Sequence, residues 1–80
     1  MVEVRYFAAA AEAAGTSKEN VELPVGATIG ELKTLLDERY GAAMTRVLKV
    51  AAFLVADELT RDADFPIGNR VDVLPPFAGG

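Results

Sequence analysis

The strongest constraint on the fold is one amphipathic segment in the middle of the chain, residues 28–41. Thr28 and Glu31 have the spacing of a capping box, in which each side chain pairs with a free backbone N–H at the start of a helix. Gly41 has no Cβ and is typical of the end of a helix. Because the other segments predict no second long helix, the apolar stripe of this one is expected to pack against a sheet. The stripe consists of Ile29, Leu32, Leu35, Leu36 and Tyr40.

The segments before and after this helix have the patterns of strands. Residues 2–7 alternate with period two, which places Phe7 on the outer face with the charged residues. Residues 70–74 alternate in the same way and place Leu74 on the outer face. Two further strands are predicted at residues 18–23 and 50–55, and a short return strand at Leu59 and Thr60. Residues 8–14 are rich in alanine and predict a short helix that ends at Gly15. The pattern of residues 42–49 indicates no element.

The order strand, strand, helix, strand, short strand, strand is that of a β-grasp domain. We therefore expect an α+β fold in which a mixed sheet of four to five strands wraps around one main helix. Eighty residues form one domain with a small core, which leaves little room for a buried catalytic cavity. The expected boundaries are 1–74 for the domain and 75–80 for an extended tail.

The tail begins with two prolines that separate it from the domain. Pro75 and Pro76 have no backbone N–H and a fixed φ, so a strand that reaches them stops pairing and continues as stiff, extended chain. Phe77 follows at a place where little of the domain remains to cover a large apolar ring. We therefore expect partner contacts around the point where the tail leaves the domain, at Phe7, Leu74, Pro75, Pro76, Phe77 and Ala78.

Gly79 and Gly80 follow this segment and lack Cβ, so they can enter a channel too narrow for any other residue. Glycine is also common in disordered chain ends. The proline pair, the aromatic residue and the strand that leads into them favour a functional arm instead. Such an arm would present the carboxylate of Gly80 to the active site of a partner.

The composition excludes several classes of function. The sequence has no Cys and no His, so no thiolate and no imidazole is available for catalysis. A net charge of -4 argues against nucleic acid as a partner and favours proteins with basic surfaces. No membrane segment or secretory leader is indicated, and we expect a cytoplasmic protein. We expect this chain to bind neither a metal nor a cofactor. The clustered acidic residues lack the spacing of a cation-binding loop and fit a solvated turn. They are Asp57, Glu58, Asp62 and Asp64.

The segment Pro-Pro-Phe-Ala-Gly-Gly at residues 75–80 resembles the end of the MoaD family, the small subunits of molybdopterin synthase. Residues 4–9 are similar to the first strand of that family and its exit, and Ala14-Gly15 to the end of its first helix. Ala56-Asp57 differs, since a hairpin of the family often carries Asn-Gly there. The resemblance implies a ubiquitin-like sulfur carrier with its first and last strands adjacent and parallel. Phe7, Leu74 and Phe77 would then lie on one continuous docking surface.

The resemblance also implies a mechanism. A MoeB-type enzyme, using its own ATP and Mg²⁺, would adenylate Gly80, and sulfur from a sulfurtransferase would convert the adenylate into a thiocarboxylate. The tail, with Gly79 and Gly80, would then enter the large synthase subunit, MoaE, and donate sulfur for molybdopterin. The chain would be non-catalytic alone and would act as the sulfur-donating subunit.

Two alternatives remain open at this point. The same tail chemistry could serve thiamine, cysteine or tRNA thiolation, or attach the chain to other proteins as a modifier. More distantly, the chain could be a β-grasp interaction module without acyl chemistry.

Overall fold

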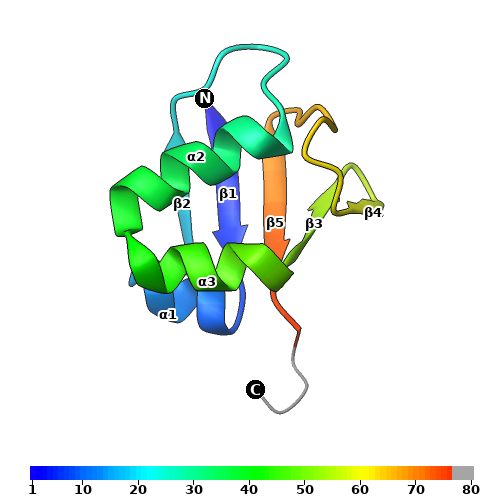
Figure 1. Ribbon diagram of the computed structural model, residues 1–80. Coiled ribbons are helices and arrows are strands. Elements are labelled where there is room, and N and C mark those ends of the chain that lie inside the picture. The colour runs from blue at the N-terminus through cyan, green and yellow to red at the C-terminus, as the bar shows by residue number, and fades with distance from the viewer. Residues whose placement is uncertain (77–80) are drawn as a thin grey trace.

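The computed structural model describes residues 1–76, in which three helices pack on one five-stranded sheet (Figure 1). The strand order is β2-β1-β5-β3-β4, with β1 and β5 parallel and the other neighbouring strands antiparallel. This arrangement confirms the predicted α+β, β-grasp fold with a mixed sheet. The elements are β1 Val2–Tyr6, α1 Ala9–Ala14, β2 Lys18–Val21, α2 Ile29–Tyr40, α3 Ala42–Val50, β3 Ala52–Val55, β4 Glu58–Thr60 and β5 Arg70–Leu74.

Strand β5 lies at the centre of the sheet, between β1 and β3. Its register with β1 pairs Val4 with Val71 and Tyr6 with Val73, and all four side chains are buried beneath the helices. Because the two strands run in the same direction, β5 ends at the same edge of the sheet as β1 (Figure 1). The fold therefore brings the segment after Leu74 next to the exit of the first strand.

Helix α2 begins with the capping box that the sequence predicts. The Thr28 hydroxyl oxygen accepts a hydrogen bond from the Glu31 N–H at 3.3 Å, and the Thr28 N–H donates to Glu31 Oε1 at 2.9 Å. These two bonds satisfy backbone groups that have no partner within a helix. On the inner side of the helix, Ile29, Leu32 and Leu36 are completely buried.

Helix α3 was not predicted, because the pattern of residues 42–49 indicated no element. Gly41 adopts φ 78°, which turns the chain sharply and lets a new helix start at the next residue. Met44 and Leu48, four residues apart, are buried on one face of α3. The predicted strand at residues 50–55 is correspondingly shorter, because Val50 ends α3 and β3 begins at Ala52.

The turn between β3 and β4 carries backbone strain. Ala56 and Asp57 form a two-residue hairpin loop with φ 50° and 69°. This left-handed conformation costs a residue with a Cβ roughly 1 to 2 kcal/mol, and hairpins of this type prefer Asn-Gly.

The double substitution Ala56→Asn with Asp57→Gly is expected to stabilise the protein. The new pair adopts a positive φ at lower cost, so the free energy of unfolding should rise by about 1 to 2 kcal/mol. Urea denaturation measures this change, and the single variant Ala56→Asn should provide part of it. An unchanged or lower midpoint in the double variant would contradict the assignment of strain to this turn.

Candidate partner-docking surface

The helices leave one face of the sheet, here called the outer face, available to a partner. Figure 1 shows α2 and α3 across the opposite face. Side chains alternate along β1 and β5 between buried and partly exposed, and the partly exposed ones belong to the outer face. Glu3 and Arg5 of β1 and Asp72 and Leu74 of β5 lie on it.

The strand register collects apolar side chains at one end of the outer face. Leu54 of β3 pairs with Leu59 of β4 on one side and with Asp72 of β5 on the other, so these three residues form a row across the sheet. Leu74 lies two residues further along β5, and Phe7 follows β1 beside it. We call this set the apolar patch: Phe7, Leu54, Leu59 and Leu74.

Two members of the apolar patch are defined by their local contacts. The Phe7 N–H donates to the Val73 carbonyl oxygen at 3.2 Å, which continues the pairing of β1 with β5 and places Phe7 beside Leu74. The Arg5 guanidinium carbon lies 5.9 Å from the centroid of the Phe7 ring, a cation–π arrangement on the outer face. Leu59 is 63% exposed, so most of its apolar side chain remains open to a partner.

The sequence-based set of contact residues missed Leu54 and Leu59. A usable signal was present, because a two-residue turn at residues 56–57 makes Leu54 and Leu59 cross-strand neighbours on one face. The continuous apolar run before the turn concealed which of its residues point outward.

The tail is described only as far as its second proline. Pro75 is buried and Pro76 is exposed. Pro75 follows Leu74, which pairs with Ala52 of β3, so the structure holds the start of the tail against the sheet. The other tail residues for which we predict a role lie outside the described residues: Phe77, Ala78, Gly79 and Gly80.

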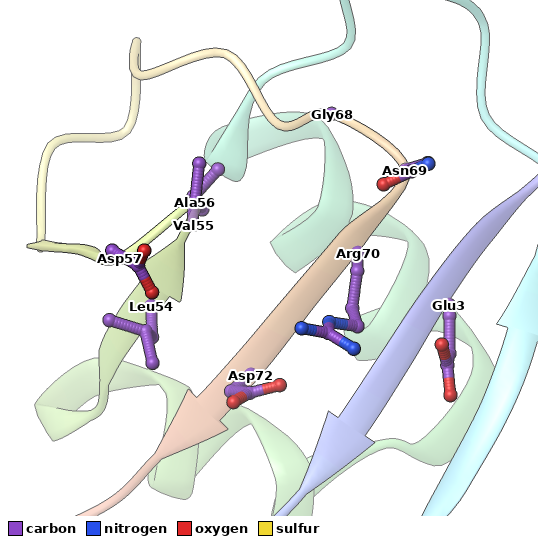
Figure 2. A pocket seen from close by; sticks show the side chains of 9 residues that line it. All are labelled: Glu3, Leu54, Val55, Ala56, Asp57, Gly68, Asn69, Arg70 and Asp72. Atoms are coloured by element: carbon purple, nitrogen blue, oxygen red, sulfur yellow. The ribbon is translucent and has the colours of Figure 1, made fainter.

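A polar hollow of about 430 Å³ adjoins the apolar patch, toward the start of β5. Figure 2 shows Glu3, Arg70 and Asp72 on the sheet and Asp57 on the β3–β4 turn around this hollow. Leu54 belongs both to the hollow and to the apolar patch. The outer face therefore changes from charged to apolar along the direction in which β5 runs.

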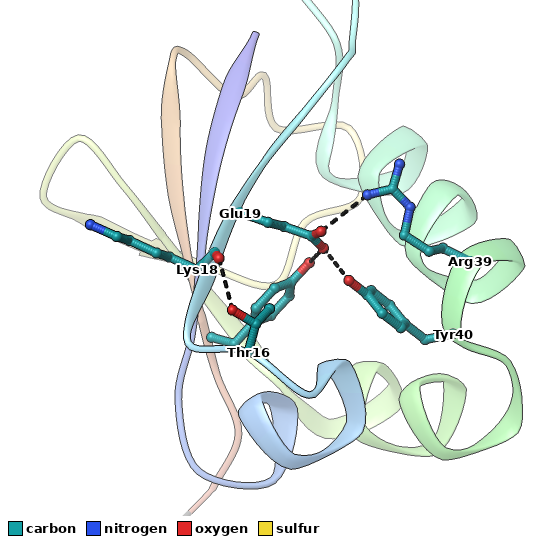
Figure 3. Close-up of polar contacts among 6 residues, drawn as sticks. Thr16, Lys18, Glu19, Arg39 and Tyr40 are labelled. Atoms are coloured by element: carbon teal, nitrogen blue, oxygen red, sulfur yellow. Dashed lines mark hydrogen bonds and ion pairs between the residues drawn. The ribbon is translucent and has the colours of Figure 1, made fainter.

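A second polar cluster ties β2 to the helical layer and lies apart from the docking surface (Figure 3). The Tyr6 hydroxyl donates to Glu19 Oε2 at 2.5 Å, and the Tyr40 hydroxyl donates to the same oxygen. Arg39 Nη1 donates to Glu19 Oε1 at 3.2 Å. One carboxylate of β2 thus joins β1 to the end of α2.

This cluster shifts the pKa values of its members. Burial acts to raise the pKa of Glu19, but the hydrogen bonds from Tyr40 and Tyr6 and the charge of Arg39 outweigh it, and the pKa is lowered. Burial and the hydrogen bond to Glu19 raise the pKa values of both Tyr6 and Tyr40 above their usual value of 10.0. The folded state therefore favours an ionised Glu19 beside two neutral tyrosines.

Stability should consequently fall at both extremes of pH. A lowered carboxylate pKa contributes stability that is present above the usual value of 4.5 and is lost as the pH falls through the folded pKa. Raised tyrosine pKa values contribute stability that is complete below 10.0 and is lost as the pH rises further.

Glu19→Gln should lower the free energy of unfolding at pH 7 by about 1.5 to 3 kcal/mol, because the two tyrosine hydroxyls and Arg39 lose their charged acceptor. The melting temperature of Glu19→Gln should also depend less on pH than that of the wild type. The same pH dependence in both proteins would contradict the role of the Glu19 carboxylate in this cluster.

The described residues contain neither buried polar side chains nor a cluster of potential metal ligands. Within residues 1–76 no polar or charged residue belongs to the buried class, and no group of three potential metal ligands lies together. No helix in that part of the chain is long and apolar enough to cross a membrane. The geometry offers a sheet surface with apolar side chains beside the start of a tail, which suits recognition by another protein.

A family model described as the ThiS family matches residues 4–80, nearly the whole sequence. The chain belongs to the ThiS family. It is 31% identical over 81 residues to the molybdopterin synthase sulfur carrier subunit of Drosophila erecta, covering 99% of this chain and 90% of that protein. The protein of the same name from Caenorhabditis briggsae is 30% identical over 82 residues, covering 99% of this chain and 96% of that protein. These similarities confirm the resemblance to small subunits of molybdopterin synthase.

Solved structures of other proteins agree with the observed fold. SAMP1 from Haloferax volcanii superposes with a TM-score of 0.78 and 25% identity, covering 99% of this chain and 98% of that chain. The small archaeal modifier protein 1 of Methanosarcina acetivorans has a TM-score of 0.66 and 22% identity, covering 99% and 95% of the two chains, and supports the fold alone.

Proposed function

We propose that this ThiS family member is a sulfur carrier that donates sulfur for molybdopterin biosynthesis as the small subunit of molybdopterin synthase. The observation that carries the proposal is its similarity, over 99% of its length, to proteins named molybdopterin synthase sulfur carrier subunit. The residues that end the match, Gly79 and Gly80, are those that the proposed chemistry requires.

The first step activates the carboxylate of Gly80. A carboxylate is a poor acyl electrophile, so its oxygen attacks the α-phosphorus of ATP, pyrophosphate leaves, and an acyl-adenylate forms. ATP and Mg²⁺ are held by a MoeB-type partner, since this sequence offers no phosphate-binding loop. Hydrosulfide supplied by a sulfurtransferase then attacks the acyl carbon, AMP leaves with the electrons of the broken C–O bond, and loss of a proton leaves Gly80 with a thiocarboxylate.

The second step delivers the sulfur. The tail enters the active site of a MoaE-type large subunit, where the thiocarboxylate transfers its sulfur to cyclic pyranopterin monophosphate. Since the sequence has neither Cys nor His, the carboxyl group of Gly80 is the position in this chain that can hold the transferable sulfur.

The folded domain contributes recognition and positioning. The apolar patch gives a partner an apolar surface on a rigid sheet, next to the strand that leads into the tail. Association on such a surface is driven by removal of apolar side chains from water. A partner seated on Phe7 and Leu74 would then have the tail directed along its own surface.

Mass spectrometry tests the proposal directly. The chain is incubated with a MoeB-type enzyme, ATP, Mg²⁺ and a sulfur source, and the mass of its C-terminal peptide is measured. Exchange of one oxygen for sulfur at Gly80 is the expected result, with an unmodified peptide when ATP is omitted. An unmodified peptide in the complete reaction would leave a plain interaction module as the function.

A role as a protein modifier is the second candidate, and the structural similarity to SAMP1 favours it. The same acyl-adenylate would then be attacked by a lysine amine of another protein, which forms an amide in place of a thiocarboxylate. The two functions differ in their stable product, so peptides that carry Gly80 linked to a lysine would support the modifier. Thiamine, cysteine or tRNA thiolation would instead be recognised by the large partner that co-purifies.

A further inference from the structure

Strand β2 forms one edge of the sheet, where it pairs with β1 and with no other strand in the described part of the chain. The Tyr6 N–H donates to the Ser17 carbonyl oxygen at 2.8 Å, so the ladder begins with a hydrogen-bonded pair. Hydrogen-bonded and non-hydrogen-bonded pairs alternate along an antiparallel ladder. Lys18 and Asn20 therefore occupy non-hydrogen-bonded positions, and their backbone N–H and C=O groups point away from β1. These groups are available to a further strand.

Neither a bulge nor a proline interrupts this edge. Sheet edges are commonly protected by such features, but the register of β1 with β2 runs through four consecutive pairs, and Pro24 follows only after the strand has ended at Val21. Figure 3 shows the side chains of Lys18 and Glu19 on opposite sides of β2, with Glu19 directed toward α2. The Thr16 hydroxyl donates to the Lys18 carbonyl oxygen at 3.0 Å, and that oxygen has a second lone pair for another donor. The edge is thus open to another strand.

The charged side chains of this edge are arranged symmetrically about Asn20. Lys18 lies two residues before Asn20 and Glu22 two residues after it, and all three side chains are exposed. Two such strands, laid antiparallel with Asn20 opposite Asn20, bring each Lys18 opposite the Glu22 of the other copy. Directly facing opposite charges stabilise a ladder, and like charges destabilise it. A shift of the register by two residues places either Glu19 opposite Glu19 or Lys18 opposite Pro24, which has no N–H to donate. The sequence of this edge therefore fits a second copy of itself in one register.

We propose that the chain self-associates through the β2 edge, with a second copy in a twofold antiparallel ladder centred on Asn20. The backbone groups of the two Asn20 residues would bond to each other, and those of Lys18 to those of Glu22 in the other copy. The two five-stranded sheets would then form one continuous sheet. Because β2 and β4 are opposite edges of the sheet, Leu54, Leu59 and Leu74 of the apolar patch would stay accessible in both copies. The inference therefore does not depend on the proposed function.

The expected dimer is weak. A ladder of this length buries much less surface than the roughly 1,000 Å² of a stable interface, so we expect a dissociation constant of about 0.1 to 1 mM. The net charge of -4 on each copy adds a general repulsion that the local charge pairs must offset.

Sedimentation velocity of charge variants tests the register. Lys18→Glu and Glu22→Lys should each weaken self-association at least about tenfold, because like charges then face each other at both ends of the ladder. An equimolar mixture of the two variants should associate about as well as the wild type, since each chain supplies the charge that the other has lost. Asp64→Lys, which makes the same charge change as Glu22→Lys on an exposed loop, should stay within about threefold of the wild type. A mixture that associates no better than its components would overturn the inference.

Amide hydrogen exchange, followed by nuclear magnetic resonance on the wild-type chain, locates the interface without any substitution. The N–H groups of Lys18 and Asn20 should exchange about two- to fivefold more slowly at millimolar than at micromolar concentration. The Leu59 N–H, in the opposite edge strand, should exchange at the same rate in both samples. Slower exchange at Leu59 and not at Asn20 would assign self-association to the apolar patch and overturn the inference. A chain that stays monomeric at millimolar concentration would overturn it as well and leave the edge to an extended segment of another protein.

Discussion

Deletion of Gly80 is expected to abolish sulfur transfer while the domain remains folded. The deletion moves the terminal carboxylate back by one residue, so the reacting carbon no longer reaches the position that the partner's active site requires. Misplacement of a reacting group by a whole residue should reduce transfer at least about a thousandfold. The measurement is the rate of thiocarboxylate formation with the adenylating enzyme, together with a thermal melt of the variant.

Two control variants show whether the length of the tail, and not any change in the sequence, determines the rate of transfer. One extra glycine after Gly80 should be as damaging as the deletion, because it also misplaces the carboxylate. Val25→Ala is the matched control, since Val25 is fully exposed in the turn before α2 and the tail is unchanged. Wild-type rates in a chain that lacks Gly79 and Gly80 would refute the proposal that the tail carries the chemistry.

A charge placed in the apolar patch should have the next largest effect. Leu59→Asp buries a carboxylate beneath a docked partner, where it has neither water nor a cation to stabilise it. The affinity for a MoaE-type large subunit should fall about a hundredfold, as is common for central apolar contacts. Isothermal titration calorimetry measures the affinity, and circular dichroism shows whether the variant is folded.

Val25→Asp provides the matched control for this charge. Val25 is fully exposed and Leu59 is 63% exposed, but Val25 lies in the turn before α2 and outside the apolar patch. Its substitution should leave the affinity within about twofold of the wild type. Equal losses in the two variants would mean that net charge, and not the apolar patch, decides binding.

The features that the sequence predicted correctly depend on short-range patterns. The capping box of Thr28 and Glu31 and the period of α2 involve neighbouring residues, so they could be recognised without knowledge of the fold. Alternation in the first and last strands likewise placed Phe7 and Leu74 on the outer face, and the parallel pairing of β1 with β5 brought them together. Their role in binding stays a prediction.

The features that were missed depend on contacts between distant segments. Helix α3 is short, and its apolar positions Met44 and Leu48 acquire meaning only when α2 and the sheet are in place beside them. The ion pair of Arg5 with Asp72 results from the register of β1 with β5, which no local pattern reveals. The same holds for Glu19, whose partners are 13 and 21 residues away in the sequence.

The central place of β5 also determines how the protein responds to mechanical load. A partner that pulls on the tail applies force along β5, which is bonded to β1 on one side and to β3 on the other. Such a pull loads both ladders in shear, so their hydrogen bonds must rupture together instead of opening one by one like a zipper. When the tail is held in a narrow channel of a partner, the folded domain can therefore be pulled away without unfolding from its last strand.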